Sequence, residues 1–255
     1  MACLICDARN AQEVIYSFNA PDKYEAYMGI QDVNRHWMRC GNCGHYHQMH
    51  NYPLWVLEKI YECRYREPQF RGVTIDQAFN EIMATPWRNS ENKQRADWFS
   101  AHTAHESLLD IGAGIGVFPS IIKDFGYEVE CVEENKISRN FLNHKGILCW
   151  DKIPEDHSYW CVSLVHVLEH IQEPDEFLKQ VHKVCKRNLF VEVPDAREFA
   201  YLPKEHDEFN SCHLWFFTLQ NLINLIERNG FTVSEVTRKF YPQRKLSRIL
   251  VLATI

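Results

Sequence analysis

Three evenly spaced glycines and one carboxylate near the middle of the chain are the first residues that could do chemistry. They are Asp110, Gly112, Gly114 and Gly116. Glycine allows a tight turn and lets the backbone lie against a ligand, because it has no Cβ. The dinucleotide pattern is G-x-G-x-x-G, and Val117 stands here in place of its third glycine. An acidic residue before the turn suits a cationic ligand better than a pyrophosphate.

A pair of carboxylates follows the glycines at a suggestive distance. Residues 127–132 alternate as a strand would, and Glu133 and Glu134 end the run. In nucleotide-binding βαβ units, a carboxylate about twenty positions after the first glycine accepts hydrogen bonds from ribose hydroxyls. Glu133 fits that position, with Glu134 as its neighbour. A glycine-rich turn beside a solvated acidic strand end is the alternative interpretation.

The stretch from Asp110 to Gly116 resembles the first motif of the class I S-adenosylmethionine-dependent methyltransferases, an acidic residue followed by G-x-G-x-G. The cofactor of that family carries a sulfonium and an ammonium, which agrees with the charge of Asp110. The resemblance covers residues 106–255. It implies an α/β, Rossmann-like, doubly wound and mostly parallel seven-stranded sheet. It also implies an adenine contact just after the third strand, where Asp151 stands.

Histidines and a glutamate end the most apolar run of the chain. Residues 160–168 suit a central parallel strand that is buried on both faces. Ligands of open α/β sheets bind at the carboxyl ends of the strands. Residues 166–178 also resemble the corresponding motif of the small-molecule branch of the family. That resemblance places His166 at the sulfonium side. An imidazole titrates near neutral pH, so His170 is the candidate general base, oriented by Glu169. Alternatively, the Glu–His pair only ties the loop to the strand.

A long polar segment, residues 196–212, follows the next predicted strand and ends just before His213. Long loops at this end of a sheet are usually functional or mobile. His213 and His206 are therefore plausible substrate contacts. A buried, hydrogen-bonded His213 without a role in catalysis is the alternative.

Two C-x-x-C pairs near the N-terminus predict a metal site. The residues are Cys3, Cys6, Cys40 and Cys43. Each spacing lets one turn present two thiolates, and four thiolates complete a tetrahedral structural zinc site. Disulfides are an alternative, but they are disfavoured in the cytosol. One of His45, His47 and His50 could also replace a cysteine as a ligand. Surface or site-facing positions suit these histidines better. The pairs resemble zinc-binding segments that precede some bacterial methyltransferase domains, including enzymes that act on nucleotide-linked sugars. The six other cysteines are expected to be small buried hydrophobes.

The elements that must position these residues follow from periodicity, since strand and helix patterns alternate after residue 106. Strands are predicted at residues 108–111, 127–132, 147–150, 160–168, 188–193, 231–237 and 247–254. Helices are predicted at residues 117–125, 137–143, 177–185 and 218–230. Two further helices are predicted before this region, one capped by Thr74 and one capped by Ser90 or Asn92.

Length and charge limit the organisation and the partners. A chain of 255 residues can hold one α/β domain and a small module. We expect a zinc-binding, ribbon-like module at residues 1–50, a helical cofactor cover at 51–105 and a methyltransferase domain at 106–255. The net charge of -6 argues against a nucleic-acid partner, because proteins that bind nucleic acids usually have a basic face. No apolar run is long enough to span a membrane and no signal peptide is visible, so the cytoplasm is the expected location.

The expected function is methyl transfer from S-adenosylmethionine to a small-molecule acceptor, with zinc in a structural role. A sugar or a nucleotide-linked sugar is a candidate acceptor, because the cysteine pairs resemble those of such enzymes. One alternative is an RNA methyltransferase that reads RNA with a basic, aromatic surface formed by Arg35, His36, Trp37 and Arg39. Another is a non-catalytic protein that only binds the cofactor. The sequence does not predict an oligomeric state.

Overall fold

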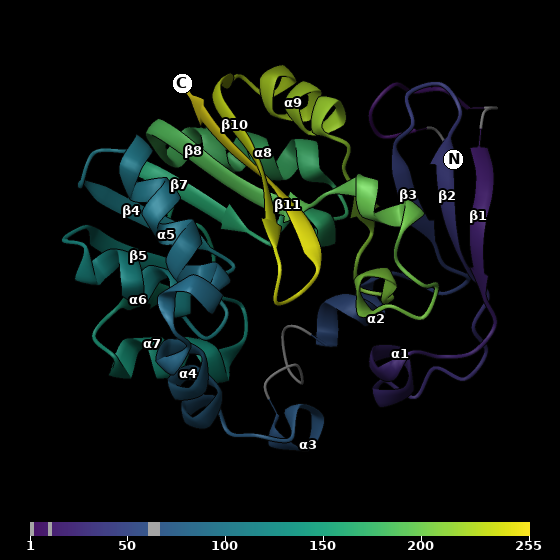
Figure 1. Ribbon diagram of the computed structural model, residues 1–255, viewed down its shortest axis with the longest axis horizontal. Coiled ribbons are helices and arrows are strands. Elements are labelled where there is room, and N and C mark those ends of the chain that lie inside the picture. The colour runs from purple at the N-terminus through teal and green to yellow at the C-terminus, as the bar shows by residue number, and fades with distance from the viewer. Residues whose placement is uncertain (1–2, 10–11, 61–66) are drawn as a thin grey trace.

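The computed structural model describes residues 3–9, 12–60 and 67–255, which form a large sheet and a small sheet (Figure 1). The large sheet has the order β10-β11-β8-β7-β4-β5-β6. Its strands are β4 (Ser107–Ile111), β5 (Glu128–Val132), β6 (Leu148–Trp150), β7 (Tyr159–Val165), β8 (Cys185–Pro194), β10 (Thr232–Tyr241) and β11 (Leu246–Thr254). Neighbours are parallel, except that β11 runs antiparallel to both β8 and β10. The predicted seven-stranded, mostly parallel sheet is confirmed.

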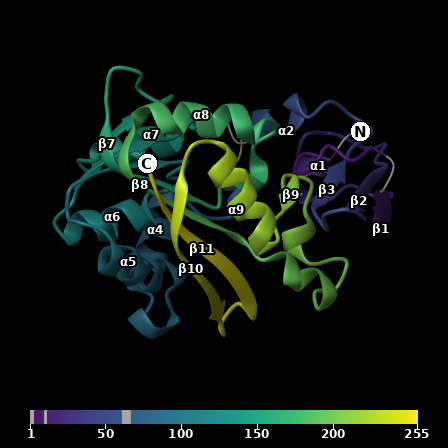
Figure 2. The same cartoon turned by 90° about the horizontal axis from the view of Figure 1, so that it is seen from above.

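Helices cover both faces of this sheet, as a doubly wound fold requires. They are α4 (Ile75–Ala84), α5 (Glu91–His102), α6 (Val117–Asp124), α7 (Lys136–His144), α8 (Pro174–Val184) and α9 (Leu219–Arg228). One apolar cluster packs α4 to α7 on one face, and a second packs α8 and α9 on the other. Figure 2 shows α5 and α8 on opposite sides of the sheet. The core therefore lies in two layers, one on each face of the strands.

The predicted helix starts are confirmed by hydrogen bonds. Thr74 and Gln77 form a reciprocal capping box at the start of α4. Ser90, rather than Asn92, caps α5, because its side chain accepts from the Lys93 N–H. These caps satisfy N–H groups that have no partner inside the helix.

The strand predicted at residues 160–168 is wrong at its C-terminal end. β7 ends at Val165, and the short 3-10 helix η3 (Leu168–His170) follows. His166 has a φ of +55°, a left-handed conformation that turns the chain out of the strand. The apolar residues beyond this turn are buried in the core, which explains why their pattern predicts a longer strand.

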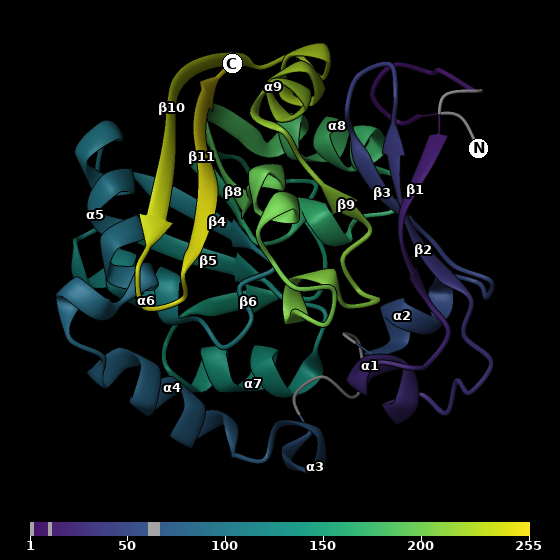
Figure 3. The same ribbon diagram turned by 45° about the vertical axis from the view of Figure 1, so that its right-hand side comes forward.

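The small antiparallel sheet has the order β1-β2-β3-β9, and its last strand comes from a distant part of the sequence. Its strands are β1 (Gln12–Phe18), β2 (Arg35–Cys40), β3 (Tyr46–Met49) and β9 (Trp215–Phe216). Tyr46 pairs with Phe216, so the N-terminal segment is bound to the late region of the chain (Figure 3). The division at residues 50 and 105 stays a prediction.

The segment predicted as a polar loop, residues 196–212, is better ordered than expected. It contains η4 (Ala196–Ala200) and η5 (Asp207–Phe209). Phe199 and Phe209 are buried against Trp37 of β2. The loop therefore contributes to the core beneath the small sheet. Because most of its residues are polar, the sequence does not predict that these two aromatic side chains are buried.

The first of the remaining short elements lies between β1 and β2, and the other three lie between β3 and β4 in the sequence. They are α1 (Lys23–Tyr27), α2 (Trp55–Lys59), α3 (Pro68–Arg71) and η2 (Trp87–Asn89). Among the residues that the structure describes, no helix has the length and apolar character needed to cross a bilayer. Five of the six scattered cysteines are buried as predicted, namely Cys131, Cys149, Cys161, Cys185 and Cys212. Cys63 lies outside the described residues.

Candidate functional site

The glycine turn leaves the carboxyl end of β4, the strand between β5 and β7. Ile111 pairs with Val132 on one side and with Leu164 on the other. The turn then runs through Gly112, Gly114 and Gly116, which all have positive φ. Three parallel strands thus end around this turn, at the edge where open α/β sheets bind ligands.

Two of these glycines are required by the packing of the chain itself. A Cβ on Gly112 would lie 2.6 Å from Cγ2 of Val167. A Cβ on Gly116 would overlap Cδ2 of Leu142 in α7. Gly112 thereby brings the glycine turn into contact with the segment that carries the site histidines.

Glu133 lies against the glycine turn, at the end of β5. Its Oε2 accepts from the Gly114 N–H at 2.7 Å, and its Oε1 accepts from the Asn135 N–H at 2.9 Å. The carboxylate is thus held by two backbone groups beside the turn. The contact of Glu133 to ribose hydroxyls stays a prediction.

The other two residues predicted on the adenine and ribose side lie nearby. The N–H of Glu133 donates to the Trp150 carbonyl, which brings the ends of β5 and β6 together. Asp151 follows directly and is exposed, and Glu134 is exposed as well. The structure therefore gathers Glu133, Glu134 and Asp151 at one edge of the sheet.

Asp110 lies inside the sheet, although its charge led us to expect a cationic ligand there. Its carboxylate accepts from the Ser163 hydroxyl at 2.6 Å, and the side chain is buried. Burial raises the pKa of Asp110 to about 7. The structure thus shows Asp110 joining β4 to β7, and its predicted cofactor role stays a prediction.

His166 lies between two buried carboxylates. Its Nδ1 is 3.1 Å from Oε1 of Glu169, and its Nε2 is 3.3 Å from Oε1 of Glu192. Burial lowers the pKa of His166, but these two carboxylates outweigh it and the pKa is raised. Arg95 of α5 also pairs with Glu192. Positively and negatively charged side chains therefore alternate along this part of the site.

Glu169, His170 and His213 form a second group, here called the Glu–His–His cluster. One ligand-type atom from each lies within 4.8 Å of the others. Burial lowers the pKa of His170 to about 4, which keeps the imidazole neutral. Burial alone would raise the pKa of Glu169, but the hydrogen bond from His166 helps to lower it to about 2.

The tautomers of both cluster histidines are fixed by backbone carbonyls. His170 Nδ1 lies 2.7 Å from the Cys212 oxygen, and His213 Nδ1 lies 2.8 Å from the Glu208 oxygen. A carbonyl oxygen can only accept, so each Nδ1 carries the proton. In a neutral imidazole of this tautomer, Nε2 carries the lone pair, which can accept a proton or bind a cation.

A cavity of about 30 Å³, enough for one water molecule, adjoins the cluster. It is lined by Leu54, Leu57, Glu58, His170, Gln172, Cys212 and Leu214. The first three come from α2 and its N-cap. Helix α2 and its N-cap thus lie beside His170 across this cavity, and the role of residues 51–105 as a cofactor cover stays a prediction.

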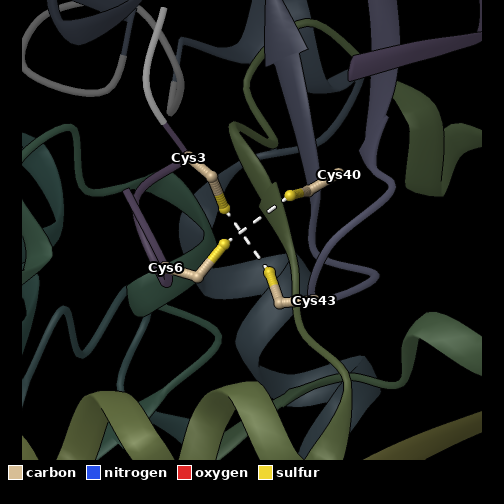
Figure 4. Close-up of side chains that lie close together, drawn as sticks. All are labelled: Cys3, Cys6, Cys40 and Cys43. Carbon is tan, nitrogen blue, oxygen red and sulfur yellow. Dashed lines mark hydrogen bonds between the residues drawn. The ribbon is translucent and has the colours of Figure 1, made fainter. Parts of the chain in front are cut away.

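The four N-terminal cysteines converge on one point (Figure 4). Cys3 Sγ lies 3.5 Å from Cys43 Sγ, and Cys6 Sγ lies 3.7 Å from Cys40 Sγ. Zinc–sulfur bonds of about 2.3 Å at tetrahedral angles place sulfur atoms about 3.8 Å apart. The arrangement fits one zinc ion, and the thiols are free rather than paired as disulfides.

The histidines beside the second cysteine pair are not ligands in this arrangement. His45 and His47 are buried, which corrects the expectation of surface positions for these two residues. The His45 ring stacks on Trp215 at 5.6 Å between centroids. The basic, aromatic surface of the RNA alternative is also not formed, because Arg35 and Trp37 are buried.

The sequence did not lead us to predict that Glu192 and Arg95 belong to the site. Glu192 is a charged residue inside an apolar run, a signal that was visible in residues 188–193. Arg95 lies within residues 51–105, which were expected to form a helical cofactor cover. No sequence pattern pairs them, because 97 positions separate the two residues.

Comparison with known proteins agrees with this geometry. Residues 76–236, more than half of the chain, match a family described as a methyltransferase domain. Among solved structures, the magnesium protoporphyrin IX methyltransferase (ChlM) from Synechocystis PCC 6803 with bound SAH is similar, with a TM-score of 0.59 and 14% identity over 79% of this chain and 99% of that chain. A possible histamine N-methyltransferase from Thermotoga maritima gives a TM-score of 0.53 and 16% identity over 70% and 94% of the two chains.

These likenesses show the fold, and the family match adds the activity. No curated protein matches the chain. The glycine turn, the strand order and the matched residues agree with one another. The chain therefore belongs to the methyltransferase domain family and is an S-adenosylmethionine-dependent methyltransferase.

Proposed function

We propose that this methyltransferase moves the methyl group of S-adenosylmethionine to a small-molecule acceptor beside the Glu–His–His cluster. The observation that carries the proposal is the contact between the glycine turn, proposed to hold the methyl donor, and the segment that carries the Glu–His–His cluster. The glycine turn and the cluster segment leave neighbouring parallel strands, and Gly112 packs directly on Val167. A methyl donor held by the turn would therefore face the cluster.

The donor side is proposed to be the glycine turn with Glu133, Glu134 and Asp151. Glu133 accepts hydrogen bonds already, and a carboxylate has room for further donors such as ribose hydroxyls. Asp151 follows the edge strand β6, where an adenine ring would lie. His166, at the end of β7, is proposed to face the sulfonium side.

The reaction is proposed to be an in-line displacement. A lone pair of the acceptor atom forms a bond to the methyl carbon, and the carbon–sulfur bond breaks with its electrons remaining on sulfur. The acceptor proton passes to a base, and Nε2 of His170 carries the lone pair for that step. The protein contributes mainly by positioning the two reactants.

A small acceptor is favoured by the surroundings of the cluster. His170 and His213 are half-buried, and α2 lines the cavity beside His170. An RNA helix would need an exposed basic surface, but Arg35 and Trp37 are buried. The cysteine site resembles that of enzymes acting on nucleotide-linked sugars, so we propose a sugar or a nucleotide-linked sugar as the first acceptor class to test.

The experiment supplies methyl-labelled S-adenosylmethionine with three separate acceptor preparations. These are a small-molecule extract, total RNA and total protein from the source cells. We expect label to be transferred to the small-molecule fraction, and Glu133→Ala should abolish the transfer. Labelling of RNA or protein instead would contradict the proposal.

A further inference from the structure

We propose that Glu169, His170 and His213 bind one divalent transition-metal ion, separate from the four-cysteine site. Their ligand-type atoms lie within 4.8 Å of one another, and they come from η3 and from the segment just before β9. Metal–nitrogen bonds of about 2.1 Å would place ligand atoms roughly 3.0 to 3.4 Å apart. Small rotations of the three side chains would close that difference.

The second shell of this site is already formed. His170 and His213 each donate Nδ1–H to a backbone carbonyl, at Cys212 and Glu208. A histidine that binds a metal almost always donates its other ring N–H in this way, which fixes the ring and directs the lone pair of Nε2. Two histidines from separate segments share this arrangement and point to a common ligand.

The side chain of Glu169 is a second, independent indication that a cation binds here. Its side chain is fully buried, with 0% exposure. Its Oε1 lies 3.1 Å from His166 Nδ1, whereas its Oε2 is buried and has no hydrogen-bond partner among the residues that the structure describes. A buried carboxylate oxygen without a partner is costly, and a bound cation would satisfy it. His166 would then orient Glu169 as the backbone carbonyls orient the two histidines.

The donor set selects the class of ion. Two imidazole nitrogens and one carboxylate suit Zn²⁺, Co²⁺ or Fe²⁺ better than Mg²⁺, which prefers oxygen ligands. Three protein ligands leave coordination positions open, as in catalytic rather than structural metal sites. The four-cysteine site, in contrast, is closed by its own sulfur atoms.

The role of the ion rests on the proposed function. An acceptor hydroxyl that binds an open coordination position would release its proton to water more readily, because the cation stabilises the oxyanion. The oxygen lone pair would then attack the methyl carbon as the carbon–sulfur bond breaks. With the ion bound, Nε2 of His170 is a ligand, and His170 no longer accepts the proton directly.

The test titrates Co²⁺ into protein whose cysteine site has been filled with zinc, using calorimetry. We expect one Co²⁺ to bind per chain. Affinity should fall at least about tenfold in Glu169→Gln and in His213→Ala, because removing a ligand costs at least as much as removing a second-shell partner. His157→Ala, which changes an exposed histidine, should bind Co²⁺ as the wild type does.

Methyl transfer and S-adenosylmethionine binding, measured on the same samples, separate the two proposals. If the wild type binds no Co²⁺, or His213→Ala and Glu169→Gln bind it unchanged, the metal site is contradicted, even where methyl transfer occurs. If Co²⁺ binds as expected but no small molecule is methylated, the metal site stands and the proposed function fails. Retained cofactor binding by Glu169→Gln shows that the variant is folded.

Discussion

Arg95 of α5 donates from Nε to Oε2 of Glu192 at 2.7 Å, and both side chains are buried. This pair joins a helix that precedes the glycine turn to the inner strand β8, which lies between β11 and β7. Glu192 also lies 3.3 Å from His166, which in turn contacts Glu169. Helix α5, strand β8 and the Glu–His–His cluster are therefore connected by one series of charged groups.

Glu192→Gln should lower the free energy of unfolding by roughly 3–5 kcal/mol, because it leaves the buried guanidinium of Arg95 without a counter-charge. Urea unfolding followed by circular dichroism would measure the change. Glu155→Gln makes the same substitution at an exposed position and should have almost no effect. Equal losses in the two variants would show that the pair adds nothing to stability.

The same substitution should change how stability depends on acid. Burial alone would raise the pKa of Glu192, but Arg95 and His166 outweigh it and lower the pKa from 4.5 to about 2. The stability that ionised Glu192 supplies is therefore complete above pH 4.5 and is lost as the pH falls towards 2. Unfolding measured over this range should show the wild type and Glu192→Gln converging at low pH. A constant difference would contradict the assigned pairing.

Gly116→Ala should destabilise the protein more than Gly29→Ala does. Both glycines have a φ of +77°, so both variants pay the left-handed cost of about 1–2 kcal/mol. Only at Gly116 does the new Cβ meet Leu142, whose displacement should cost about 1–3 kcal/mol more. Thermal unfolding compares the two directly. Equal stabilities would mean that α7 does not pack on the turn as described.

Cys40→Ser should remove the metal ion proposed at the four-cysteine site. Elemental analysis of the purified wild type should find zinc, and this variant should lose it because three thiolates remain. Cys185→Ser, at a buried thiol that is not part of the group, should retain zinc. Zinc retained in Cys40→Ser, or absent from the wild type, would exclude this assignment.

The sequence predicts the parts of this fold that depend on neighbouring residues. The strand at Leu108, the glycine turn and the helix from Val117 form one continuous pattern, and the capping box at Thr74 spans only four residues. The cysteine pairs are also local signals, because each C-x-x-C unit is read within one turn. These features could be placed correctly without knowledge of distant contacts.

The missed features depend on distant contacts. β9 has two residues, too few to carry a periodic pattern, and it forms only because β3 offers its edge. The pairing of Arg95 with Glu192 depends on the packing of α5 on the sheet. The chain leaves the strand at His166 because this residue has a positive φ, which its residue type does not predict. Long-range geometry, rather than composition, assembles this part of the site.

Calorimetric titration with S-adenosylmethionine tests the central claim most directly, with the wild type, Glu133→Ala and Glu128→Ala compared. Glu128 lies exposed at the other end of the same strand, so its variant is the matched control. We expect saturable binding to the wild type and to Glu128→Ala, and binding weakened at least about tenfold in Glu133→Ala, since hydrogen bonds to a charged group contribute roughly 1.5–3 kcal/mol. Folded wild-type protein that binds NAD instead, or that binds no S-adenosylmethionine, would contradict the account.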